Sequence, residues 1–255
     1  MTARRAVLMA AVAVAAVACS SSAGEDKVRP QEQPKSGGTL TFATDADPGC
    51  LDPHQSPTAA SQLVTRGVVD SLVAQDPKTL ALKPWLAESW TATPDATSFT
   101  FTLRTGVTFS DGTPFDAEAV KANFDRIVNP ATKSLLAASL LAGYDGTTVA
   151  DPRTVTVKFK APNASFPQAA STAFLGMQSP KVFEAGPEAV CRKPVGSGPF
   201  VAAERQPQAS ITLSKRADYN WGPETTEHKG APYLDQVVIN IVPENGVRMG
   251  SLRTS

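Results

Sequence analysis

The stretch PWLAESWTATPDATSFTFTLRTGVTFSDGTPFDAEAVKANF, residues 84–124, carries the strongest structural signals in the chain. Within it, residues 98–104 alternate apolar and polar side chains, which is the period-two pattern of a strand with one buried face. The apolar members of this pattern are Phe99, Phe101 and Leu103. A second short strand is expected at 107–109. The first half of the stretch therefore predicts two strands.

A turn and a helix are predicted to follow these strands. Asp111 and Gly112 have turn chemistry, because glycine tolerates the positive φ that other residues resist. Asp116 is placed to cap a helix, and Glu118 suits the positive end of the helix dipole. Apolar residues then recur at helical spacing through Val128. The stretch as a whole predicts a strand pair that leads into an amphipathic helix.

Periodicity elsewhere predicts further strands and helices separated by short connections. Strands are expected at 39–43, 147–150, 154–160, 211–215 and 237–242, and helices at 59–72, 132–141 and 166–174. No internal repeat is visible. The mixture of strands and helices predicts an α/β class, with mixed α+β character.

The first 18 residues have the composition of an export signal. Arg4 and Arg5 precede an apolar run at 6–18, which is shorter than the about 20 residues needed to span a bilayer. The tetrapeptide AVAC that ends at Cys19 resembles a lipoprotein cleavage box, so Cys19 is the expected lipid anchor. The alternatives are an ordinary signal peptide cut elsewhere and an uncleaved anchor.

Residues 19–37 are rich in Ser, Gly, Pro, Gln and charge without apolar periodicity, which indicates a flexible tether. The chain carries 24 Lys and Arg against 24 Asp and Glu. Loss of Arg4 and Arg5 with the signal peptide leaves 22 basic residues against 24 acidic ones. This balance gives no reason to expect nucleic acid or an acidic surface as a partner.

Residues 84–124 resemble the signature of the family 5 extracellular solute-binding proteins, the peptide- and nickel-binding receptors of ABC importers. Further blocks follow in the family's order over nearly everything after residue 36: GTLTFA at 38–43, CLDPH at 50–54, VGSGPF at 195–200, SITLSKRADYNW at 210–221, and 234–252. The resemblance implies a periplasmic-binding-protein-like type II lobe I with an inserted subdomain.

The resemblance also implies a division of the chain. Lobe I is expected at 38–81 and 180–243, the inserted subdomain at 82–179, and the start of the crossing to lobe II at 244–255. The second lobe is absent from this sequence, so the expectation is a truncated copy with impaired binding, because closure of two lobes around the ligand is the family's working motion.

The function that the resemblance implies is capture of a peptide or related small solute outside the cell and delivery to an ABC permease in the membrane. A monomer without a cofactor is expected, lipid-anchored in the cell envelope. The family's ligand contacts fall on Ser56, Pro57, Thr58 and Ala59, and near Leu136. The solute itself stays open among dipeptides, longer peptides, glutathione-like compounds, metal chelates and sugars.

Cys50 and Cys191 are left once Cys19 is assigned to lipid. In an oxidising compartment they form a candidate disulfide, since each lies beside a block of the family resemblance. Two unpaired buried thiols are the alternative.

Two other patterns invite functional readings. Potential metal ligands crowd the segment 45–54, but their spacing does not fit a zinc site, so an irregular loop without metal is expected. These ligands are Asp45, Asp47, Cys50, Asp52 and His54. The Gly196-Ser197-Gly198 turn is neither a P-loop nor a G-x-S-x-G nucleophile elbow. The rival functions are therefore a secreted hydrolase, which rests on this turn and the acidic loop, and a nonfunctional remnant or interaction protein.

Tryptophans provide one further candidate for a ligand pocket. Trp85, Trp90 and Trp221 could line such a pocket, although core packing is the commoner use of these residues.

Overall fold

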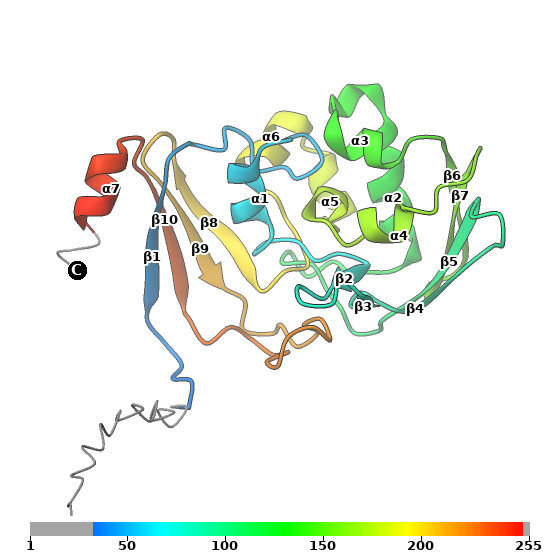
Figure 1. The fold of residues 1–255 in the computed structure, drawn as a ribbon, viewed down its shortest axis with the longest axis horizontal. Helices are drawn as coiled ribbons and strands as arrows, with labels where there is room; N and C mark the ends of the chain where they lie inside the picture. The colour runs from blue at the N-terminus through cyan, green and yellow to red at the C-terminus, as the bar shows by residue number, and fades with distance from the viewer. Residues whose placement is uncertain (1–32, 252–255) are drawn as a thin grey trace, which may run out of the picture. The chain divides into compact units, whose positions relative to one another are not determined.

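Helices lie between two four-stranded sheets in the computed structural model, which describes residues 33–251 (Figure 1). Residues from Lys35 onward form one contact unit. The predicted signal peptide, the lipid anchor Cys19 and most of the predicted tether fall outside the described residues. None of the helices within residues 33–251 has the length and apolar character needed to cross a bilayer.

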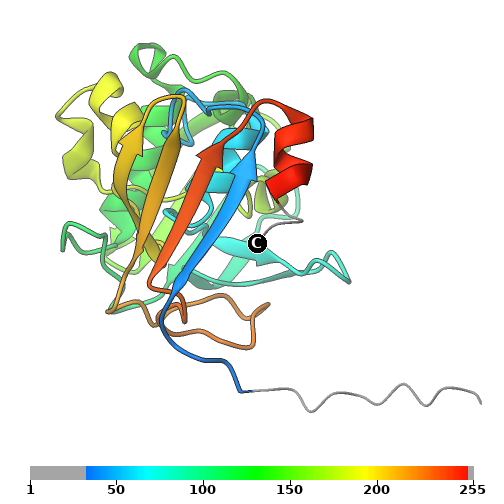
Figure 2. The ribbon, with the colours of Figure 1, turned by 90° about the vertical axis from the view of Figure 1, so that its left-hand side faces the viewer.

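The first sheet has the strand order β1-β10-β9-β8. Strand β1 runs parallel to β10, and the other neighbours are antiparallel. Figure 2 shows this sheet face on, with helices behind it. Its strands are β1 (Thr39–Thr44), β8 (Phe200–Gln206), β9 (Ser210–Lys215) and β10 (Gln236–Ile241).

The second sheet is antiparallel throughout and has the order β4-β5-β7-β6. Its strands are β4 (Ala87–Ala92), β5 (Ser98–Leu103), β6 (Tyr144–Asp151) and β7 (Thr154–Phe159). A separate hairpin joins β2 (Val73–Gln75) to β3 (Leu82–Pro84). The α-helices are α1 (Ala59–Thr65), α2 (Ala117–Val128), α3 (Leu136–Leu140), α4 (Phe166–Ala169), α5 (Pro180–Phe183), α6 (Pro187–Arg192) and α7 (Asn245–Ser251).

The strand and helix predicted within residues 84–124 are confirmed. The apolar side chains of β5 are at most 1% exposed. Helix α2 begins where expected, because the Asp116 carboxylate accepts a hydrogen bond from the Ala119 N–H at 2.9 Å. Phe124 of α2 packs against Phe166 of α4 with ring centroids 5.9 Å apart. Burial of such a ring contributes about 1.5–3 kcal/mol, so this contact ties the helix layer together.

The helix predicted over 59–72 is wrong in its second half, because α1 ends at Thr65. Beyond it, the carbonyls of Gly67 and Val68 accept hydrogen bonds from the Phe200 and Gly198 N–H groups, at 2.9 and 2.8 Å. The chain must leave the helix to make these bonds. Helical spacing over 59–72 predicts an inward side that includes Leu63, but this side chain is 52% exposed.

Three smaller predictions also need correction. The strand at 107–109 is a single bridge between Thr108 and Pro114. The helix at 132–141 is shorter, because Lys133 adopts a left-handed φ of 56° that separates a 3-10 turn from α3. The helix at 166–174 divides at Thr172, whose backbone is extended.

The predicted bounds of lobe I and the subdomain stay a prediction. One hydrophobic cluster lies under the first sheet and includes Leu51, Val64 and Ile239. The larger cluster combines the second sheet and its helices with Trp221, which lies outside 82–179. Packing therefore crosses the proposed boundary between the subdomain and lobe I.

Candidate functional site

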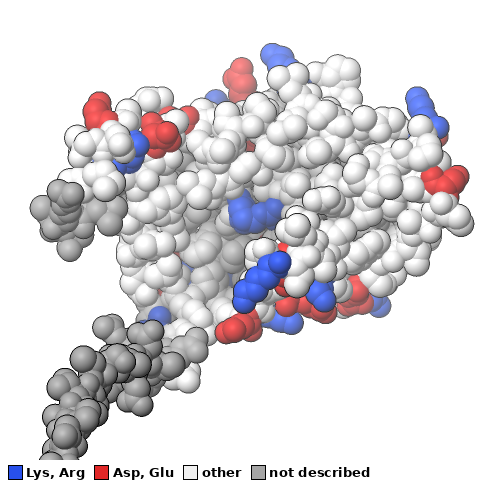
Figure 3. Space-filling model, viewed as in Figure 1, with Lys and Arg blue, Asp and Glu red and all other residues white. Residues whose placement is uncertain are grey.

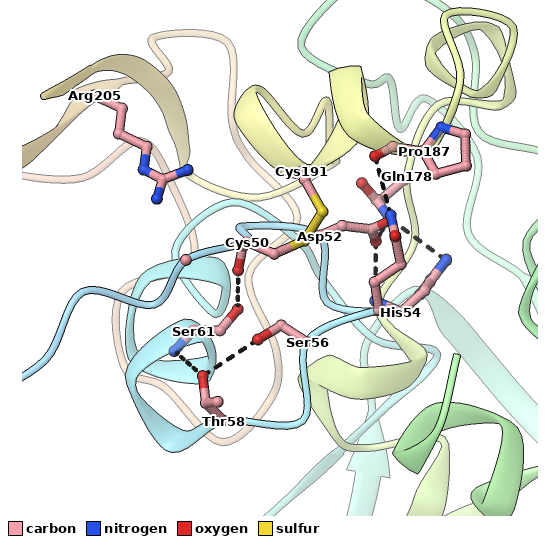
Figure 4. Close-up of a disulfide and its surroundings, with 12 residues drawn as sticks. Cys50, Asp52, His54, Ser56, Thr58, Ser61, Gln178, Pro187, Cys191 and Arg205 are labelled. Carbon is pink, nitrogen blue, oxygen red and sulfur yellow. Dashed lines mark hydrogen bonds between the residues drawn. A yellow bond between two sulfur atoms is a disulfide. The ribbon is translucent and has the colours of Figure 1, made fainter. Parts of the chain in front are cut away.

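The loop that precedes α1 is fixed by covalent and ionic links. A disulfide joins Cys50 to Cys191, with their Cα atoms 4.5 Å apart (Figure 4). The same two segments are linked by a backbone hydrogen bond of 2.8 Å from the Leu51 N–H to the Cys191 carbonyl. The loop is therefore held against α6 before it reaches the predicted ligand contacts.

Buried polar groups complete this anchor. Asp52 is fully buried, pairs with Arg126 of α2 and accepts a hydrogen bond from the Gln178 amide at 2.9 Å. Burial acts to raise the pKa of Asp52, but the contacts with Arg126 and other donors outweigh it and hold this pKa below its usual range.

His54 belongs to the same network. Its Nε2–H donates to the Gly176 carbonyl at 2.9 Å, which leaves Nδ1 to accept from Arg126 at 2.8 Å. Burial lowers the pKa of His54 to about 4, so the ring is neutral at physiological pH. The side chain has no free nitrogen for catalysis or metal binding.

The potential metal ligands of the loop are engaged in other contacts. Asp47 pairs with Arg205 at 2.9 Å and accepts the Gln208 N–H at 2.7 Å, while Cys50 is in the disulfide and Asp52 pairs with Arg126. Within residues 33–251, no three His, Cys, Asp or Glu side chains are grouped to hold a metal ion. These contacts hold the loop in position.

The predicted ligand contacts lie around the start of α1, apart from Leu136. Ser56 is buried, with its hydroxyl 3.2 Å from that of Thr58, and Thr58 caps α1 by accepting the Ser61 N–H at 3.2 Å (Figure 4). Pro57, Thr58 and Ala59 are exposed, and Leu136 is half-buried at the start of α3. None of these residues lines the four principal hollows of the described chain.

The Gly196-Ser197-Gly198 turn is packed against the backbone after α1. A Cβ at Gly196 would lie 2.1 Å from the Val68 carbonyl oxygen, so only glycine fits there. Ser197 is fully buried, and its hydroxyl accepts the Asp70 N–H at 3.3 Å. A substrate could not reach this hydroxyl.

The principal hollow, of about 610 Å³, lies beyond the C-terminal end of α1. This size is within the range of small-molecule sites. Segments far apart in the sequence form it: α1, β2, the connection from α4, the start of β8 and the loop between β9 and β10. Figure 3 shows a recess in the middle of one face, in which blue Lys or Arg atoms are visible. Lining side chains include Arg66, Gln75, Trp85, Thr172, Tyr219 and His228.

Arg66 is the basic centre of this hollow. Its two terminal nitrogens donate to the Ser71 hydroxyl at 2.9 Å and the Ser171 carbonyl at 3.0 Å. Its guanidinium carbon lies 5.2 Å from the centroid of the Trp85 ring. Burial lowers the pKa of Arg66 to about 10, which still leaves it charged at physiological pH. Trp85 is thus a core residue that also forms part of the hollow.

Asp70 lies behind the hollow and is fully buried. It accepts hydrogen bonds from the Trp221 indole at 2.9 Å and the Tyr219 hydroxyl at 3.3 Å. Burial raises the pKa of Asp70 to about 6. Trp221 is therefore a buried partner of Asp70, in keeping with a core role.

Sequence reasoning missed the hollow because it placed Arg66 inside a continuous helix. One signal was present: a lone arginine stands among the buried Val64, Val68 and Val69. A cation in such a position needs polar partners from elsewhere in the chain. Those partners, Ser71 and Ser171, come together only in the folded chain.

Solved structures share this fold. The structure of the periplasmic binding protein DppA from Helicobacter pylori, in complex with the peptide STSA, matches with a TM-score of 0.73 at 26% identity, over 87% of this chain and 46% of that chain. A dipeptide-binding protein from Pseudoalteromonas, in complex with Met-Leu, matches with a TM-score of 0.73 at 25% identity, over 85% of this chain and 46% of that one. The fold is that of an ABC-transporter binding protein.

The family model of bacterial extracellular solute-binding proteins, family 5 (middle), matches residues 81–255. The chain belongs to the family 5 bacterial extracellular solute-binding proteins. Among curated relatives, the glutathione-binding protein GsiB from Salmonella paratyphi A is 34% identical over 204 residues, which is 80% of this chain. The chain spans only 38% of that relative's length.

Proposed function

We propose that this chain is the solute-binding component of an ABC importer, which captures peptides or a related small solute outside the cell and delivers them to a membrane permease. Family membership is the observation that carries this proposal. Three of the similar proteins add a ligand class, since they are named with glutathione, STSA and Met-Leu, which are all peptides.

The site would use two regions of the described chain. The hollow offers an aromatic wall at Trp85 and a cation at Arg66, a combination suited to peptide side chains and carboxylates. The second contact region is proposed on the strength of the family resemblance. It consists of the exposed segment from Pro57 to Ala59, the buried Ser56 and Leu136.

Binding by this length of chain is proposed to be weak. The curated relative is more than twice as long, since the chain spans 38% of it. A ligand enclosed from one side buries less surface and forms fewer of the polar contacts that give affinity. This is the sense in which binding by this chain would be impaired.

The proposed location is the outer surface of the plasma membrane, where the chain would act as a monomer held by lipid on Cys19. Stable attachment needs more than one acyl chain, which an N-terminal lipidated cysteine supplies. Cys19→Ala is expected to release the protein into the soluble fraction of cells, whereas Cys50→Ala, which removes a different cysteine, should stay with the membrane. Equal fractionation of the two variants would contradict the anchor.

A hydrolase is the weaker alternative. Ser197 was its candidate nucleophile, and this hydroxyl is fully buried and bonded to the Asp70 N–H. The relatives are named as binding proteins. A non-enzymatic role is therefore proposed.

Saturation-transfer NMR on the purified chain tests the proposal with glutathione, STSA and Met-Leu. Thermal shift is less suitable, because ligand at a concentration equal to Kd stabilises by only about 0.4 kcal/mol. We expect saturable binding with millimolar Kd and full recovery of intact peptide. Absence of saturable binding to all three would overturn the proposed function, and cleavage products would favour a hydrolase. A micromolar Kd would overturn only the weak binding.

A further inference from the structure

Three partly buried arginines of this protein have an acidic partner. Arg126 pairs with Asp52, Arg205 with Asp47 and Arg216 with Asp218. Arg66 forms no ion pair with any residue from 33 to 251. The buried Asp70 carboxylate attracts Arg66, but it lies beyond ion-pair distance and accepts its hydrogen bonds from Trp221 and Tyr219. A cation withdrawn from water with so incomplete a compensation gains more from an anion that reaches it than an exposed arginine would.

The guanidinium of Arg66 is held in place before any ligand arrives. Hydrogen bonds to the Ser71 hydroxyl and the Ser171 carbonyl use two of its five N–H donors, and Trp85 lies against its face. Three donors remain without a hydrogen bond to the described residues. A planar guanidinium fixed in this way is pre-organised for a carboxylate, which it can bind through two parallel bonds.

The rest of the hollow favours an anion that carries an apolar group. Its lining contains no Asp or Glu. The nearby Asp70 carboxylate is directed to the Trp221 indole and the Tyr219 hydroxyl, and it makes no hydrogen bond to Arg66. Trp85, Pro199 and Phe200 supply apolar surface on the same hollow. One positive charge beside apolar walls matches the carboxylate and side chain of an amino acid residue.

We infer that the Arg66 hollow is a carboxylate subsite, which receives the C-terminal carboxylate and apolar side chain of a peptide or a similar organic acid. The inference rests on the proposed function for its ligand class and names the group that the chain recognises. Arg66 is then the residue that distinguishes a free carboxylate from an amide, because the neutral amide cannot accept two charge-assisted bonds.

NMR of the arginine Nε–Hε signals in the full chain tests this directly, with N-acetyl-leucine and N-acetyl-leucinamide as probes. The Arg66 signal is assigned by its loss in Arg66→Gln. We expect the acid to shift this signal saturably, with an affinity at least about tenfold greater than that of the amide. Equal responses to the two probes, or no response of Arg66 to the acid, would overturn the subsite.

Variants then separate a role in binding from a role in folding. Arg66→Gln should abolish the preference for acid over amide. Arg66→Lys should retain part of it, because lysine keeps the charge but lacks the planar pair of N–H donors. The matched control Arg153→Gln removes an arginine charge whose side chain is 49% exposed and paired with Glu88, outside the hollow, and should leave the preference intact. If Arg66→Gln fails to fold, Arg66→Lys assigns the signal instead, because lysine also lacks the Nε–Hε group, and the wild-type titration then decides the matter.

The two proposals fail in different ways. Peptide binding without an acid-over-amide preference would refute the subsite and leave the receptor function standing. A carboxylate response at Arg66 with no binding of glutathione, STSA or Met-Leu would refute the peptide receptor and leave the subsite.

Discussion

Removal of the Cys50–Cys191 disulfide should destabilise the protein chiefly through its unfolded state. The two cysteines are 141 residues apart in the sequence. Cross-linking a loop of 100 residues is worth about 4.7 kcal/mol in the chain-entropy account, and the dependence on length is logarithmic, so the value here is about 5 kcal/mol. The native arrangement should survive, because the hydrogen bond from the Leu51 N–H to the Cys191 carbonyl holds the same segments together.

The assay is urea unfolding of the wild type and of Cys50→Ala/Cys191→Ala, followed by tryptophan fluorescence. The double variant keeps Cys19, so any thiol chemistry of that residue is common to both proteins. We expect a loss of about 2–5 kcal/mol in the free energy of unfolding, and a comparable loss when the wild type is reduced. The reductant should leave the double variant unchanged.

A loss below about 1 kcal/mol would refute this reasoning, since it would mean that the cross-link barely restricts the unfolded chain. Alkylation of Cys50 and Cys191 in the wild type before reduction would show that the bond is not formed.

Two further predictions concern the buried network and the glycine turn. Burial lowers the pKa of His54 to about 4, from 6.5 when unfolded, so the unfolded chain binds a proton between these values that the folded chain does not. Stability from His54 is therefore complete above pH 6.5 and is lost as the pH falls toward 4, by about 3 kcal/mol. Asp70, whose pKa burial raises to about 6, acts in the opposite direction in the same range, so the test is the difference between wild type and His54→Gln in unfolding free energy at pH 7 and pH 4. A difference that does not change with pH would count against the buried neutral ring. In the turn, Gly198→Ala places a Cβ 2.5 Å from the Val68 carbonyl carbon and should cost about 1–3 kcal/mol, whereas Gly246→Ala, with nothing within 4 Å, should be close to neutral in the same thermal unfolding measurement.

Three strands of the second sheet, β5, β6 and β7, and the helix α2 were predictable because their signals are local, whereas β4 was not predicted. In β5, alternate residues face the core, so the polarity of each side chain indicates which face of the sheet it lies on. In α2, the cap at Asp116 bonds to a residue three positions later. Neither feature depends on distant parts of the chain.

The prediction of a helix over 59–72 was wrong where distant segments form hydrogen bonds with its backbone carbonyls. Residues 66–72 have helical periodicity, but the carbonyls of Gly67 and Val68 are bonded to the N–H groups of Phe200 and Gly198, more than a hundred residues away in the sequence. The early end of α1 places Arg66 at a helix terminus, where it reaches Ser171. The hollow exists because of this interruption.

The sequence by itself thus determined the family, the class of fold and the order of most elements, because those follow from local periodicity, capping and motif order. Tertiary structure alone decided which polar groups have partners. Asp52 and His54 are candidate ligands in the sequence, but they accept hydrogen bonds from Gln178 and Arg126 in the fold. Arg66, by contrast, keeps N–H donors without a partner among the described residues, beside an open hollow. That distinction depends on which side chains meet across the fold, and spacing along one chain does not contain it.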